Sequence, residues 1–251
     1  MLSDLENRVT IASAGGIPPL IALLRPPSVG VQERAAGALR NLSDNDENAV
    51  TIASAGGIPP LIALLRSPLA DVQQNSATAL RNLSVNVENA VTIASAGGIP
   101  PLIALLRSPS VDVQENAAGA LWNLSVNVEN AVTIASAGGI PPLIALLRSP
   151  LVDVQEKAAG ALLNVSVNVE NAVTIASAGG IPPLIALLRS PSADVQMQAV
   201  GALWILSMNV ENRVTIASAG GIPPLVALLA SPSVDVRDAA ARALDRLGVD
   251  H

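Results

Sequence analysis

The stretch GGIPPLIALL at residues 97–106 decides the fold, because it returns at a fixed interval along the chain. Its opening Gly-Gly pair also stands at 15/16, 56/57, 138/139, 179/180 and 220/221, which gives an interval of 41 residues. A period of this length is typical of stacked helical units that cannot bury their apolar faces alone. We therefore expect one domain, residues 1–251, with repeats at 6–46, 47–87, 88–128, 129–169, 170–210 and 211–251.

The third repeat predicts three helices and thus an all-α fold. The first covers residues 88–96 and ends at Gly97-Gly98, since glycine readily takes the left-handed conformation beyond a helix end. The second opens at Pro100-Pro101, where a missing N–H is tolerated. The third follows the break Ser108-Pro109-Ser110 and reaches about Ser125. Its helical spacing predicts a buried stripe of Val113, Ala117, Ala120, Leu121 and Leu124.

The composition excludes several classes of partner. A net charge of −6 argues against nucleic acid, which clustered Lys and Arg residues bind. The absence of cysteine excludes disulfides and thiolate metal sites. The start, MLSDLENR, lacks an apolar core of signal-peptide length, and Gly and Pro interrupt the long uncharged stretches, so neither secretion nor a membrane span is expected. We expect a cytoplasmic protein.

Side chains suited to catalysis are scarce. The only histidine is His251, the only lysine is Lys157, and the chain has neither a thiol nor a phenol. A metal site of the His/Cys kind cannot be assembled from this set. Carboxylates are available, but no pattern places a pair of them in a buried pocket that would tune one as an acid. We therefore expect a protein that is not an enzyme and holds no cofactor or metal.

Two recurring segments carry a resemblance to a known family. The stretches GGIPPLIALL at 97–106 and AAGALWNLS at 117–125 resemble armadillo repeats of the β-catenin type, and the likeness recurs in register along the chain. The resemblance implies a right-handed α-solenoid of six three-helix repeats, whose third helices line a concave groove for an extended peptide. It also implies that one third-helix Asn in each repeat binds the peptide main chain. The matching positions are Asn41, Asn82, Asn123 and Asn164.

Two departures from the family pattern bear on the groove. Ile205 and Arg246 replace the Asn in the last two repeats, so the row of carboxamides should be interrupted there. The importin-α type of groove carries a Trp four residues before this Asn. Gly37, Thr78, Gly119 and Gly160 stand at those positions here, which argues against recognition of nuclear signals.

An Asn in such a row has a simple physical use. Its carboxamide offers a donor and an acceptor, so it can pair with the main chain of a peptide without reading the peptide's sequence. Two extended residues span roughly 6.6–7.2 Å, and packed helices lie about 8–10 Å apart. One Asn per repeat can therefore follow about two peptide residues. The other interpretation of this Asn is a residue near a helix end that bonds to its own backbone.

The repeats differ mostly on one side of the third helix, at positions that share a face with the Asn. Besides the four Asn residues, the candidate peptide-binding residues there are Arg34, Arg40, Asn75, Arg81, Glu115, Asn116, Trp122, Glu156 and Trp204. Arginines make the first two repeats basic and carboxylates make the next two acidic, so a partner with an acidic stretch followed by basic residues would fit. Neutral drift of a solvent-exposed face explains the same variation.

A second class of function remains open from the sequence. The last repeat carries more charged residues than the inner repeats, as the polar outer face of a terminal repeat requires. The first repeat keeps the apolar residues of the inner repeats. Head-to-tail or homodimeric self-association of a structural scaffold is therefore the alternative to peptide binding. Repeats this similar arise by recent duplication or by design from an averaged repeat, and the array is near consensus in either case.

Overall fold

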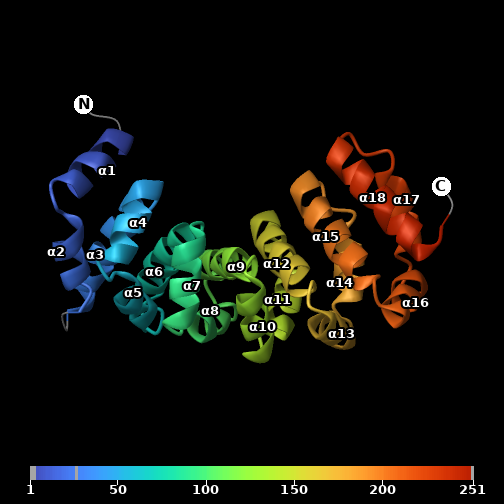
Figure 1. Ribbon diagram of the computed structural model, residues 1–251, viewed down its shortest axis with the longest axis horizontal. Coiled ribbons are helices and arrows are strands. Elements are labelled where there is room, and N and C mark those ends of the chain that lie inside the picture. The colour runs from blue at the N-terminus through green and yellow to red at the C-terminus, as the bar shows by residue number, and fades with distance from the viewer. Residues whose placement is uncertain (1–3, 26–27, 250–251) are drawn as a thin grey trace. The chain divides into compact units, whose positions relative to one another are not determined.

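The computed structural model describes residues 4–25 and 28–249, and every regular element in these two ranges is a helix (Figure 1). The structure divides into two compact units, residues 1–130 and 131–251, and each is considered by itself. The proposal of a single domain of six repeats remains a prediction. The division falls within helix α10 (Val128–Ser136), which opens the fourth repeat.

Helices follow one another in the predicted triplets of two short helices and a longer third. The first unit contains α1 (Asp4–Ser13), α2 (Ile17–Ala22), α3 (Val29–Leu42), α4 (Asp46–Ser54), α5 (Ile58–Leu64), α6 (Ala70–Leu83), α7 (Val87–Ser95), α8 (Ile99–Leu105) and α9 (Val111–Ser125). The second contains the rest of α10, then α11 (Ile140–Leu146), α12 (Val152–Val165), α13 (Val169–Ser177), α14 (Ile181–Leu187), α15 (Ala193–Leu206), α16 (Val210–Ser218), α17 (Ile222–Leu228) and α18 (Val234–Leu247).

The two glycines between the first and second helices of the third repeat have different structural roles. Gly97 takes a φ of 78°, a left-handed conformation that favours glycine over every other residue. Gly98 has an ordinary φ but no room for a side chain. A Cβ placed there would lie 2.7 Å from Ile93 Cγ2 and 2.9 Å from the carbonyl oxygen of Ile93. The pair therefore turns the chain and lets the second helix start directly against the first.

Polar side chains cap the starts of several first and third helices. Asn86 precedes α7, and its Oδ1 accepts from the backbone N–H of Asn89 at 3.0 Å. Because Asn86 is the N-cap, α7 begins at Val87, one residue before the predicted start. Ser110 caps α9 in the same way, since its Oγ accepts from the backbone N–H of Val113.

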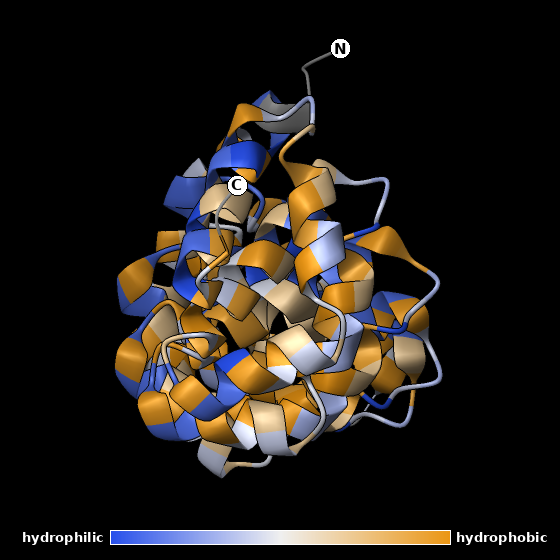
Figure 2. Ribbon diagram, turned by 90° about the vertical axis from the view of Figure 1, so that its right-hand side faces the viewer, coloured by the Kyte–Doolittle hydropathy of each residue, from blue (hydrophilic) through white to orange (hydrophobic). Residues whose placement is uncertain are grey.

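The core lies between the helices of each repeat and between successive third helices. In the first unit α3 packs on α6 and α6 on α9, and in the second α12 packs on α15 and α15 on α18. All five residues of the predicted stripe on α9 have no exposed surface. Hydrophobic and hydrophilic residues alternate around single helices, as this packing requires (Figure 2). In the described ranges, no helix is long and apolar enough to cross a membrane.

Candidate functional site

All of the predicted site residues lie on third helices. In the first unit, α3 carries Arg34, Arg40 and Asn41, α6 carries Asn75, Arg81 and Asn82, and α9 carries Glu115, Asn116, Trp122 and Asn123. We call this set, without the buried Asn116, the third-helix face. Because α6 packs against both α3 and α9, the face continues from one repeat to the next. In the second unit, α12 carries Glu156 and Asn164 and α15 carries Trp204, all half-buried.

The carboxamides of Asn82 and Asn123 are tied to the repeat before them. Nδ2 of Asn123 donates to the carbonyl oxygen of Arg81 and to Ser84 Oγ, both at 3.1 Å. Nδ2 of Asn82 donates to Ser43 Oγ at 3.2 Å and lies 3.5 Å from the carbonyl oxygen of Arg40. Each Asn thus satisfies a carbonyl near the end of the preceding third helix, where intrahelical partners run out.

This arrangement narrows the predicted role of the Asn residues. The side-chain nitrogen of each Asn bonds to the preceding repeat. The sequence suggested instead either a bond to a bound peptide or a bond to the backbone of the Asn's own helix. Within the described ranges, no donor bonds to Oδ1 of Asn82 or Asn123, and both residues are half-buried rather than sealed. Two oriented acceptor atoms, Oδ1 of Asn82 and Oδ1 of Asn123, therefore remain on the third-helix face.

The serines that hold these carboxamides were not among the predicted site residues. Ser43 and Ser84 are each 3% exposed, and their hydroxyls donate to the carbonyl oxygens of Arg40 and Arg81. Each hydroxyl therefore donates within its own repeat and accepts from the next Asn. The recurrence of Asn-Leu-Ser at 41–43, 82–84 and 123–125 was the available signal. Its repetition has a structural cause, because the Asn of one repeat binds the Ser of the repeat before it.

Arg40 is fixed by carboxamide oxygens. Its Nε and Nη2 donate to Asn41 Oδ1 at 3.2 and 3.1 Å, and its Nη1 donates to Asn75 Oδ1 at 3.0 Å. Asn75 is in turn oriented by its Nδ2, which donates to the carbonyl oxygen of Glu33 at 3.4 Å. The guanidinium group is thus held between α3 and α6 by neutral acceptors.

Arg81 occupies the same repeat position as Arg40 but has a charged partner. Its Nη1 lies 3.5 Å from Glu115 Oε1 on α9, and the two side chains are 31% and 27% exposed. An ion pair this exposed contributes little to stability, yet it places an opposite charge beside Arg81. The predicted basic character of the first repeats therefore resides mainly in Arg34, which is exposed, and Arg40, which is half-buried.

Asn116 is placed differently from its counterpart Asn75. It is 7% exposed, and its Nδ2 donates to the carbonyl oxygen of Asp112 in its own helix at 2.7 Å. Its Oδ1 is buried without a partner in the described part of the chain. A peptide cannot reach a side chain covered in this way, so we leave Asn116 out of the proposed site.

A hollow of about 570 Å³ lies beside Asn123 at the edge of the third-helix face. Valines at two successive junctions between a third helix and the next first helix line it. Val85 and Val126 lie in the connections, Val87 and Val128 are the first residues of α7 and α10, and each of the four is at least 63% exposed. The hollow offers apolar contact next to the carboxamide row.

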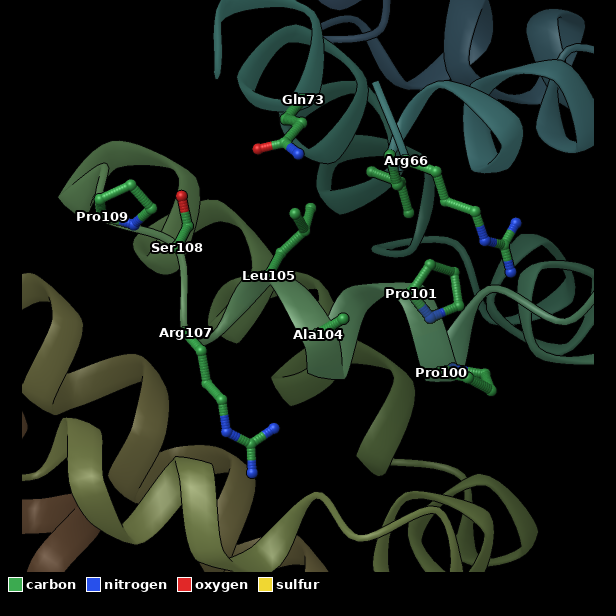
Figure 3. Close-up of a pocket in the computed structure, with 10 residues that line it drawn as sticks. Arg66, Gln73, Pro100, Pro101, Ala104, Leu105, Arg107, Ser108 and Pro109 are labelled. Atoms are coloured by element: carbon green, nitrogen blue, oxygen red, sulfur yellow. The ribbon is translucent and has the colours of Figure 1, made fainter. Parts of the chain in front are cut away.

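A second hollow, of about 450 Å³, belongs to the repeating scaffold (Figure 3). Residues from the end of α5, from α6 and from α8 line it, among them Leu105 and Gln73. The Nε2 group of Gln73 donates to the backbone oxygen of Ser67 at 2.8 Å, so its polar end is already used. Arg107 points away from Gln73 and Leu105 in Figure 3. Since the second unit has a matching hollow at α11 and α14, we interpret both as consequences of the repeated packing.

In the described part of the chain, no group of three or more His, Cys, Asp or Glu side chains could hold a metal ion. His251, the only histidine, lies outside the described residues. The geometry of the third-helix face therefore provides hydrogen-bond acceptors, a fixed cation and apolar contacts. Such a set can hold a chain of peptide groups in place.

Comparison with known proteins identifies the kind of repeat from which the chain is built. The family model of the armadillo repeats of ARMC5 matches residues 2–246. No curated protein matches the chain. One engineered protein of known structure is 33% identical, with a TM-score of 0.86 over 94% of this chain and 99% of its own. Another is 35% identical, with a TM-score of 0.90 over 97% of this chain, which spans 61% of that protein.

A designed armadillo repeat protein in complex with the peptide (KR)4 is 27% identical to this chain. The two superpose with a TM-score of 0.83, over 92% of this chain and 99% of the designed protein. These similarities confirm the predicted fold class, an all-α solenoid built from three-helix repeats.

Proposed function

The chain belongs to the armadillo repeat family of ARMC5, and on this basis we propose that it is a non-enzymatic scaffold that binds an extended peptide segment along its third-helix face. The observation that carries the proposal is the state of Asn82 and Asn123. Each carboxamide is oriented through its nitrogen by the preceding repeat, while its oxygen has no donor in the described part of the chain.

The fixed orientation of the two carboxamides favours binding, because ordering the peptide and the side chains that contact it costs free energy. A carboxamide already fixed by two hydrogen bonds loses little further freedom when its oxygen accepts a peptide N–H. Equivalent positions in successive repeats present the acceptors at the repeat spacing, which suits an extended chain. The residue directly before the Asn changes from arginine (Arg40, Arg81) to tryptophan (Trp122) in the third repeat, and this change would give preference for particular peptide residues.

Selection from an unbiased peptide library tests the proposal. We expect selection on the wild-type chain to enrich extended peptides. A variant with Asn82→Ala and Asn123→Ala should bind the most enriched peptide on the order of tenfold more weakly, because two hydrogen-bond acceptors are lost. A comparison variant carries Ser43→Ala and Ser84→Ala, which removes one of the two bonds that orient each carboxamide and keeps its oxygen, so its loss of affinity should be smaller than that of the Asn variant. No enrichment, or equal losses in both variants, would contradict the proposal.

Self-association is a second candidate function, because the first repeat exposes apolar side chains whose counterparts in later repeats are buried. Ile11 is 46% and Leu23 is 44% exposed, whereas their counterparts Ile52 and Leu64 are 0% and 6% exposed. At the other end of the chain, Arg242 is exposed at the repeat position of Gly37, where a Cβ would lie 3.4 Å from Asn75 of the following repeat. An arginine at that position opposes stacking of a further repeat on the last one.

Light scattering across a wide concentration range separates the two candidates. Self-association through the first repeat predicts a mass that rises with concentration and returns to that of one chain in an Ile11→Asp variant. Since Ile11 lies at the end of the array, away from Asn82 and Asn123, the same change is expected to leave peptide binding intact. A constant monomer mass for the wild-type chain would remove this candidate.

A further inference from the structure

The guanidinium group of Arg40 is positioned but not neutralised. Its three hydrogen bonds go to the carboxamide oxygens of Asn41 and Asn75, and they leave an unused N–H on each terminal nitrogen. In the ranges that the structure describes, no carboxylate lies within ion-pair distance of Arg40. A half-buried cation of this kind is only partly solvated, so an opposite charge that reaches it interacts more strongly than in open water.

The equivalent arginine of the next repeat has the carboxylate partner that Arg40 lacks within the described residues. Arg81 stands at the equivalent position, and Glu115 of the following repeat supplies its counter-charge. The residue equivalent to Glu115 in the second repeat is Gln74, which is neutral. The pairing that satisfies Arg81 from within the chain is therefore missing at Arg40. Arg34, exposed on the same helix, adds positive charge to this end of the face.

We propose that Arg40 is a carboxylate subsite of the third-helix face, which takes the side chain of an aspartate or glutamate in the bound peptide. This inference rests on the proposed peptide-binding function and adds the identity of one preferred residue and its place. A carboxylate accepts from two guanidinium N–H groups at once, and such pairs are stronger and more directional than bonds to neutral groups. The subsite lies beside Asn82, whose Nδ2 approaches the carbonyl oxygen of Arg40 itself.

The direction of the preference is opposite to that of the peptide in the designed relative. That protein is in complex with (KR)4, a peptide that carries only cationic side chains. In this chain the beginning of the face holds Arg34 and Arg40, and the acidic Glu115 is already engaged by Arg81. We therefore expect a cationic peptide to be disfavoured where the first two repeats meet.

Nuclear magnetic resonance of the arginine side chains tests the subsite even when binding is weak. The probes are the peptides (DA)4 and (NA)4, which differ in charge and share the spacing of alternate residues, together with (KR)4. In the 15N-labelled full chain, (DA)4 is expected to shift the Nε–H signal of Arg40 in a saturable way, whereas (NA)4 and (KR)4 leave it in place. An Arg40 Nε–H signal that does not shift with (DA)4, or that shifts equally with (NA)4, would overturn the proposal.

Two variants make the test specific to the site. Arg40→Gln is expected to weaken (DA)4 binding by about tenfold, the loss of one charge-assisted pair. Glu115→Gln releases Arg81, so (DA)4 should bind about threefold more tightly and begin to shift the Arg81 signal. If Arg40→Gln and wild type bind (DA)4 equally, the subsite is wrong. Sodium acetate at the same carboxylate concentration must give a smaller shift, because an equal one would show an adventitious ion only.

The results also separate this inference from the function on which it rests. If library selection enriches peptides that depend on Asn82 and Asn123 but carry no acidic residue near Arg40, peptide binding stands and the carboxylate subsite fails. If no peptide is enriched and (DA)4 leaves every third-helix signal unmoved, both fail together. Enrichment of acidic peptides that Arg40→Gln abolishes supports both.

Discussion

Replacing Leu121 by alanine is expected to lower the free energy of unfolding by about 2–5 kcal/mol. Leu121 lies in α9, a helix that packs on α6, and has no exposed surface. Truncation removes apolar contacts and leaves a cavity that neighbours on rigid helices cannot fill. Urea denaturation followed by circular dichroism measures the loss.

Val126→Ala is the matched control for this change. Val126 follows α9 directly, is 68% exposed, and loses little buried surface when shortened. Its effect on the free energy of unfolding should remain within about 0.5 kcal/mol, as is usual for surface substitutions. Equal losses in the two variants would mean that α9 is not packed as described. Because repeats unfold with their neighbours, the two variants are best compared by the shift of the same transition.

The second large effect is expected from Gly98→Ala. The new methyl group would lie 2.7 Å from Ile93 Cγ2, 2.9 Å from the carbonyl oxygen of Ile93 and 3.2 Å from Ile62 Cδ1. The carbonyl is backbone and cannot move aside cheaply, so α7 and α8 must separate. Overpacking of this kind costs about 1–3 kcal/mol, which we expect as a loss in the free energy of unfolding.

Gly30→Ala is the matched control for the glycine substitution. Gly30 lies in the first turn of α3, and a Cβ built there meets nothing within 4 Å. The change is expected to be neutral or to stabilise by up to about 1 kcal/mol, because alanine loses less conformational freedom than glycine in a helix. Thermal unfolding of both variants gives the comparison. A Gly98→Ala variant as stable as Gly30→Ala would contradict the close approach of α7 and α8.

The sequence predicted the helices well because their signals are local. The Gly97-Gly98 pair, the prolines after it and the Ser110 cap act on residues within one or two turns. The buried stripe of α9 followed from helical spacing alone. The start of α7 was missed by one residue because capping by Asn86 depends on the conformation of the connection before it.

The site was predicted less completely, because its hydrogen bonds join different repeats. That Asn82 and Asn123 lie on third helices was predicted, but their bonds to Ser43 and Ser84 depend on how one repeat sits on the next. Equivalent residues also behave differently. Asn75 reaches across to α3, whereas Asn116 bonds within its own helix and is buried. Spacing along one helix does not decide between these two conformations.

The difference between Arg40 and Arg81 shows what a comparison of repeats can add. Both stand directly before the Asn of their repeat, and the sequence suggested that both make the face basic. The structure pairs Arg81 with Glu115 and leaves Arg40 among carboxamides. The change from Gln74 to Glu115 at one repeat position was visible in the sequence, but its effect needed the distance between neighbouring third helices.

The most direct test of the account is a crystal structure of the chain with a peptide selected from the library. We expect the peptide to lie extended along the third-helix face, with its main-chain N–H groups donating to Oδ1 of Asn82 and Asn123. Their Nδ2 groups should keep the bonds to Ser43 and Ser84. A peptide bound elsewhere, or one that crosses this face without a main-chain bond to either carboxamide oxygen, would contradict the account.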